Sequence, residues 1–253
     1  MDLTTTQGIK MLYLIKRKPA TSREELIMHW FKNHMPGVSK RHADAKAAGQ
    51  PHAWRYIVAL FDANSDRNYP WDGIAQIWMS ENYEEAAQKD KKLWHPDVPI
   101  GSNPTDTLQE KSLPYLPWAT REYVVIDGSD QLPVTPLTLN EPYPSTRSGF
   151  LRISFLVKAK PGTDYDAFFT HWLNVHVPNV KNIMDLTGGF HYVVNHSIEP
   201  TEVPYAGLAE LYFHDADGWD RYRELIKPDG MEEWIDRSGM QVLRSTTEMV
   251  GIP

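Results

Sequence analysis

An internal repeat constrains the fold of this chain more than any other feature of its sequence. When residues 14–38 are laid over residues 156–180, 10 of the 25 positions are identical, whereas about one or two identities would arise from composition alone. The two halves are therefore related copies of one unit. Shorter matches continue at decreasing offsets, pairing residues 54–58 with 190–194, 72–78 with 206–212, and 122–125 with 248–251.

Each copy predicts the same order of secondary structure. An apolar strand ends at Lys-x-Lys-Pro, a capping box opens a helix that ends at a proline, and two strands, a second helix and a closing strand follow. In the first copy we expect strands at 9–15, 56–61, 74–79 and 121–126, and helices at 22–36 and 81–92. In the second copy we expect strands at 151–157, 192–195, 208–213 and 246–252, and helices at 163–178 and 217–226.

The order β-α-β-β-α-β is that of the ferredoxin-like unit, in which both helices cover one face of an antiparallel sheet. The other face must also be buried, and two copies in one chain can bury it by packing sheet against sheet. We therefore expect an α+β fold of two ferredoxin-like units, at 9–126 and 150–252, fused into a pseudo-dimeric α/β barrel. Residues 127–149 contain four prolines and predict an extended linker.

Composition excludes several classes of function. The 26 Lys+Arg residues against 33 Asp+Glu give a net charge of −7 without a basic run, which disfavours nucleic acid and a membrane surface as partners. The absence of cysteine excludes disulfides and thiolate chemistry. Without a signal-peptide pattern or a spanning segment, we expect a cytoplasmic protein that binds a small molecule, and a homodimer of the fused chain is possible.

The first helix of each copy carries the strongest candidate site. Trp30 and His34 are separated by four residues and share one helix face, and Trp172 and His176 repeat this arrangement. A histidine on an aromatic face can be an acid/base catalyst, but it can also be a packing residue with a satisfied ring. Both interpretations stay open, because a duplication preserves structural residues as well.

Other side chains could complete a pocket between helix and sheet. Aromatic strand residues are usually core, but here they would form a flat apolar slot, and a basic residue at a strand end could neutralise a carboxylate. The candidate substrate-binding residues are Trp30, Trp172, Tyr13, Tyr56, Tyr192, Arg152, His196 and His214. His42 is expected on an exposed helical extension. No metal-ligand spacing and no nucleotide-binding loop is present, so no metal or other cofactor is predicted.

The repeated Lys-x-Lys-Pro, the His-Trp followed by His and Pro, and the Gly-x-Ala and Glu-x-Val strands resemble the EthD-like family of the dimeric α/β-barrel superfamily. This resemblance implies a ligand cavity between sheet and helices, and it places the family's histidine at His34 and His176. It also implies catabolic or polyketide chemistry, with cofactor-free dehydratases in the family and monooxygenases and haem enzymes among its neighbours.

Three hypotheses of function follow. The first is a cofactor-independent isomerase, dehydratase or hydrolase that uses His34 or His176 on a small unsaturated organic acid, such as an aromatic ring-cleavage or polyketide intermediate. The second is a haem- or metal-dependent oxidoreductase, and the third is a non-catalytic protein that binds a hydrophobic metabolite. The two pockets are expected to differ, and the polar strand residues of the second copy favour His176 as the working base.

Overall fold

The protein has a mixed α+β fold, which a computed structural model describes for residues 3–63, 70–81, 107–114, 116–132, 134 and 144–253. The chain divides into two compact units. The first, which we call the His34 unit, comprises residues 7–119, 134–148 and 247–253. The second, the His176 unit, comprises residues 1–6, 120–133 and 149–246.

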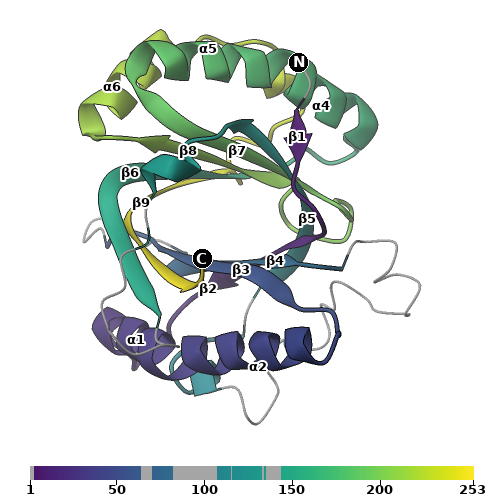
Figure 1. The fold of residues 1–253 in the computed structure, drawn as a ribbon. Helices are drawn as coiled ribbons and strands as arrows, with labels where there is room; N and C mark the ends of the chain where they lie inside the picture. Colours follow the sequence, from purple (N-terminus) through teal and green to yellow (C-terminus); the bar gives the residue numbers. More distant parts are fainter. Residues whose placement is uncertain (1–2, 64–69, 82–106, 115, 133, 135–143) are drawn as a thin grey trace. The chain divides into compact units, whose positions relative to one another are not determined.

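The His34 unit contains an antiparallel sheet in the order β2-β4-β3-β9, with helices on one face (Figure 1). Leu26, Trp30 and Val38 from the helices pack with Ile15 and Tyr56 from the sheet to form its core. The elements are β2 (Lys10–Ile15), α1 (Arg23–His29), α2 (Met35–Ala47), β3 (Ala53–Leu60), β4 (Gly73–Met79), a 3₁₀ turn (Thr107–Glu110) and the end of β9 (Gln241–Ile252).

The His176 unit repeats this plan with a sheet in the order β6-β8-β7-β5-β1 and helices on one face (Figure 1). Phe168, Trp172 and Tyr192 lie in its core. The elements are β1 (Thr4–Thr5), β5 (Leu116–Ile126), β6 (Ser145–Val157), α4 (Tyr165–His171), α5 (Val177–Thr187), β7 (Gly189–Ser197), β8 (Gly207–Phe213), α6 (Ala216–Leu225), and 3₁₀ turns at Ser129–Gln131 and Met231–Glu233.

Each unit includes the closing strand of the other sequence half. Residues 120–126 of β5 pair with β7, and residues 247–252 of β9 pair with β3. The compact units therefore do not coincide with the two sequence copies. On the helix-free face of β2, Leu12 and Leu14 are fully buried, and Arg152 and Ser154 on β6 are fully buried as well.

The first helix of each copy continues through its proline, although the sequence predicts that it ends there. A π-helical turn at Trp30–His34 joins α1 to α2, and an equivalent turn at Trp172–His176 joins α4 to α5. Proline cannot donate to the carbonyl four residues earlier and its ring crowds that carbonyl. The wider π turn, closed by Met35 N–H donating to Trp30 O, places the proline in the first turn of the next helix, where it is tolerated.

Other predictions met different outcomes. In the first copy, the capping box of Ser22 and Glu25 is confirmed. In the second copy, the predicted cap at Thr163 is wrong: Asp164 caps α4, and the Thr163 hydroxyl donates to Lys160 O. The second helix of the second copy is confirmed as α6. Its counterpart at 81–92 lies almost wholly outside the described residues. Part of the predicted linker is regular structure, because β6 begins at Ser145 and a 3₁₀ turn occupies Ser129–Gln131.

Candidate active site

The His34 unit contains a cavity of about 190 Å³ between its helices and its sheet. Most of its wall is aromatic and aliphatic, and a few polar side chains reach it, which is the usual make-up of a small-molecule site. The lining residues are Tyr13, Ile15, Trp30, His34, Val38, Arg41, His42, Tyr56, Ala75, Ile77 and Leu108. The structure thus brings together four of the predicted site residues: Tyr13, Trp30, His34 and Tyr56.

Trp30 and Tyr56 form a buried polar pair in the cavity wall. The indole Nε1–H of Trp30 donates to the Tyr56 hydroxyl oxygen at 3.0 Å. This hydrogen bond joins the helix to the sheet within the cavity wall. Tyr13 is half-buried and lines the cavity, and burial raises the pKa of its phenol to about 12. The Tyr13 phenol is therefore a neutral donor at physiological pH.

His42 is a site residue that the sequence reasoning missed. It was expected on an exposed extension, and α2 does extend beyond the proline, but the imidazole is half-buried and lines the cavity. Ala53 N–H donates to its Nδ1 at 3.0 Å. A sequence signal existed, since His42 lies eight residues after His34 and thus on nearly the same helix face.

The second copy differs around its histidine. His176 Nδ1 lies 2.8 Å from Asp229 Oδ2, and Asn179 Nδ2 donates to the same oxygen at 2.7 Å. Although burial raises it, the pKa of Asp229 is held well below its usual range by the hydrogen bonds from His176 and Asn179. A carboxylate at Nδ1 orients an imidazole, as in catalytic triads, so His176 is held in place by a contact that sequence spacing could not reveal.

Bulky apolar side chains replace polar ones in the second copy. Ile183 and Met184 stand where the first copy has Arg41 and His42, and Met184 is fully buried. Met184 belongs to a core cluster with Trp219 and Tyr222, whose rings stack at 5.4 Å between centroids. The predicted residues Trp172 and Tyr192 are buried in this same core. Burial in that core raises the pKa of Tyr192.

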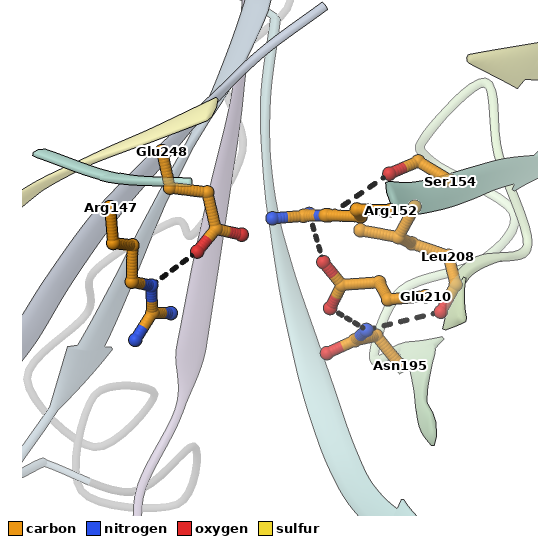
Figure 2. A network of polar contacts seen from close by, with 7 residues as sticks. All are labelled: Arg147, Arg152, Ser154, Asn195, Leu208, Glu210 and Glu248. Carbon is orange, nitrogen blue, oxygen red and sulfur yellow. Dashed lines mark hydrogen bonds and ion pairs between the residues drawn. The ribbon is translucent and has the colours of Figure 1, made fainter. Parts of the chain in front are cut away.

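Arg152 is held by a buried polar network, not at a strand end as predicted. Because β6 begins at Ser145, Arg152 lies in mid-strand, where its guanidinium donates to Glu210 and to the Ser154 hydroxyl (Figure 2). Asn195 Nδ2 donates to Glu210 Oε2 at 3.0 Å and to a backbone carbonyl. Arg147 makes a comparable contact with Glu248 within the His34 unit. The guanidinium of Arg152 is thus already engaged by a protein carboxylate.

The two remaining predicted residues lie away from the cavity lining. His196 is buried with its ring stacked on Phe169 at 4.1 Å between centroids, and burial together with the charge of Arg121 lowers its pKa to about 3. His214 is exposed and stacks on Phe190 at 4.7 Å. Both rings are packed against aromatic side chains, and their assignment to substrate binding stays a prediction.

Two kinds of feature are absent from the described residues. Within the described ranges, no group of three or more His, Asp or Glu side chains is arranged to hold a metal ion. No helix in the same part of the chain has both the length and the apolar character needed to cross a membrane.

Comparison with known proteins supports the resemblance read from the sequence. Residues 160–238 match the model of the EthD domain family, and no curated protein matches the chain. An anthrone oxidase-like protein of known structure has a TM-score of 0.52 at 10% identity, over 98% of this chain and 94% of that chain. Chlorite dismutase from Candidatus Nitrospira defluvii has a TM-score of 0.48 at 10% identity, over 95% and 92%.

These findings show that residues 160–238 are similar to the EthD domain and that the fold is similar to that of the anthrone oxidase-like protein. The family match does not include the first copy, whose relation to the domain comes from the internal repeat. Identity of 10% to the anthrone oxidase-like protein establishes likeness of fold alone.

Haem, which occurs among neighbouring families, does not fit the described cavity. A porphyrin macrocycle requires far more room than about 190 Å³.

Proposed function

We propose that the cavity of the His34 unit binds a small, flat, unsaturated organic acid, and the similarity of residues 160–238 to the EthD domain supports this proposal. His34 acts on this compound as general acid and base. An aromatic ring-cleavage or polyketide intermediate is the substrate class, and isomerisation, dehydration or hydrolysis is the reaction. The proposal depends chiefly on one observation: His34 reaches an aromatic-walled cavity that two phenols and a second imidazole also line.

The chemistry needs few groups. His34 takes a proton from the carbon next to a carbonyl, and the electron pair moves onto the carbonyl oxygen to give an enolate. Return of the proton to a different carbon completes an isomerisation, and loss of a β-hydroxyl as water completes a dehydration. Histidine is the side chain suited to both accept and return a proton near neutral pH, and such general acid–base catalysis contributes about 10²–10⁴ in rate.

The enolate oxygen needs hydrogen-bond donors. The neutral phenol of Tyr13 supplies one from the sheet, beside the hydrogen bond from the Trp30 indole to the Tyr56 hydroxyl oxygen. Apolar walls strengthen these bonds because they exclude water. His176, preferred from the sequence, is the second candidate base, because its contact with Asp229 is one that activates imidazoles. The cavity and the donors around His34 nevertheless favour the first copy.

We expect the His34→Gln variant to lose about 100-fold of the activity, because glutamine keeps the polarity and approximate size of the side chain but cannot shuttle a proton. The measurement is exchange of carbon-bound protons in D₂O, followed by NMR for a panel of unsaturated acids. This readout detects proton abstraction even where no net product accumulates.

The matched control is His176→Gln, whose amide can still donate to Asp229. We expect it to retain most of the exchange rate. A loss confined to His176→Gln would transfer the proposal to the second copy. If wild type bound the acids and neither variant changed the exchange of their protons, the third hypothesis, a non-catalytic binding protein, would replace the enzyme.

We also propose that the two copies are ferredoxin-like halves of one pseudo-dimeric barrel. Support comes from the buried helix-free faces of both sheets and from the closing strands, each of which pairs in the unit of the other copy. A protease site inserted in the predicted linker 127–149 tests this. After cleavage, the two fragments should co-elute on gel filtration until denaturant is added, whereas their separation under native conditions would contradict it.

A further inference from the structure

His42 is a second imidazole in the cavity, and the acid–base chemistry proposed for His34 does not use it. It comes from α2, and its ring is half-buried where the helix passes over the start of β3. Arg41, beside it, also lines the cavity but is exposed. The protonation state of His42 can be read from its hydrogen bond.

The bond between Ala53 and His42 fixes that state. A backbone N–H can only donate, so the Nδ1 atom that it contacts at 3.0 Å must be an acceptor and carries no proton. The imidazole is then neutral, and its single proton lies on Nε2. Within the described part of the chain, Nε2 makes no hydrogen bond. His42, which lines the cavity, therefore has an N–H group that can donate to a ligand.

The surroundings of the ring favour the same neutral form. Burial is the largest influence, and the charges of Arg41 and His52 act in the same direction, so the pKa of His42 lies below its ordinary value. His42 would also lose the Ala53 hydrogen bond if Nδ1 became protonated. The ring is thus held in its neutral tautomer with the proton on Nε2, which can donate one hydrogen bond.

The second copy shows that the fold does not need a histidine at this position. Its equivalent is Met184, which is fully buried in the core cluster of the His176 unit. A polar side chain at this position therefore occurs only in the first of the two copies, which is also the copy that contains the cavity.

We propose that His42 is a ligand-binding residue whose Nε2–H donates to an oxygen atom of the ligand that bears or develops negative charge. The ligand class is thereby narrowed to compounds with a carboxylate, phenolate or enolate oxygen at the α2 side of the cavity. This inference rests on the proposed function of the cavity, but it makes a separate claim about which atom binds the oxygen.

The first test needs no ligand. Long-range ¹H–¹⁵N correlation spectra of the imidazoles distinguish the two neutral tautomers and the cation, and comparison with the His42→Asn variant assigns the signal. We expect His42 to give the pattern of the Nε2–H tautomer at neutral pH. A cationic ring or the Nδ1–H tautomer would overturn the proposal.

The second test compares two flat probes, 4-nitrophenolate and 4-nitroanisole, which differ in having or lacking a charged oxygen. We expect wild type to prefer the phenolate and His42→Asn to lose about 10- to 100-fold of that affinity, the range for a hydrogen bond to a charged group. Binding of 4-nitroanisole should change little. Asparagine still offers an oxygen to Ala53 N–H but does not reach as far as Nε2, so the fold is kept.

The control is His52→Asn, since His52 is outside the cavity lining and bonds Gln50 O. It should leave the preference for phenolate intact. If wild type binds both probes and His42→Asn weakens both equally or neither, the role of His42 is refuted while the cavity remains a binding site. If wild type binds neither probe, the proposed function and the inference fail together.

Discussion

Replacing Glu210 by alanine should lower the free energy of unfolding by about 3–5 kcal/mol. Glu210 is the carboxylate that contacts the Arg152 guanidinium, and both side chains are almost completely excluded from solvent. Without Glu210, the Arg152 cation would remain in a low-dielectric surrounding, and the side-chain amide of Asn195 would lose an acceptor as well. Denaturant unfolding at pH 7, followed by tryptophan fluorescence, measures the change.

Two further variants separate the charge from the packing. Glu210→Gln introduces the residue that the first copy has at the corresponding position, Gln76, and should recover part of the loss because an amide still accepts from Arg152. Replacing both partners, as Arg152→Met with Glu210→Leu, should recover most of it, because no buried charge is then left. If Glu210→Ala alone lowered the free energy of unfolding by less than about 1 kcal/mol, other groups would be compensating the charge of Arg152.

The elements of this fold could be predicted because their signals are local. The capping box at Ser22, the apolar strand segments and the repeat itself all depend on residues close in sequence, and the structure contains the predicted strands in both copies. The sequence could not predict that each closing strand pairs with the sheet of the other copy. Residues 121–126 have the pattern of a strand whichever sheet they join. The π turns were also missed, since Pro36 and Pro178 favour a helix end as much as a widened turn.

The candidate site was predictable to a similar degree. Helical spacing placed His34 beside Trp30, and strand equivalence placed Tyr13 and Tyr56 near them, where the cavity is found. Sequence could not show that His176 contacts Asp229, because 53 residues separate the two. Sequence also could not show that Arg152 contacts a buried carboxylate, because Glu210 comes from a different strand.

His196, a predicted substrate-binding residue, lies in an aromatic enclosure. Its ring is enclosed by Phe169, Trp172 and Tyr123, with centroid distances of 4.1, 4.9 and 5.2 Å. Its Nε2 atom is buried and, within the described residues, has no hydrogen-bond partner. Burial favours the neutral form of such a ring, because a cation in this enclosure would be removed from water.

The burial of His196 should make the protein sensitive to acid. Burial, aided by the charge of Arg121, lowers the pKa of His196 from 6.5 to about 3 in the folded state. Below pH 6.5 the unfolded chain binds a proton that the folded chain does not, so stability falls as the pH decreases from 6.5 towards 3 and this contribution then levels off. A difference of 3.5 pKa units corresponds to a loss on the order of 5 kcal/mol.

The His196→Leu variant isolates this effect, because the first copy has Leu60 at the equivalent position and the pocket is apolar. Carboxylates such as Asp229 also titrate in acid, but they do so in both proteins. The difference between the unfolding free energies of variant and wild type should therefore be nearly constant above pH 7 and should increase in favour of the variant from pH 6.5 downwards. Parallel stability curves from pH 7 to pH 4 would show that His196 accepts a proton in the folded state, and that the aromatic enclosure admits water or a partner to the ring.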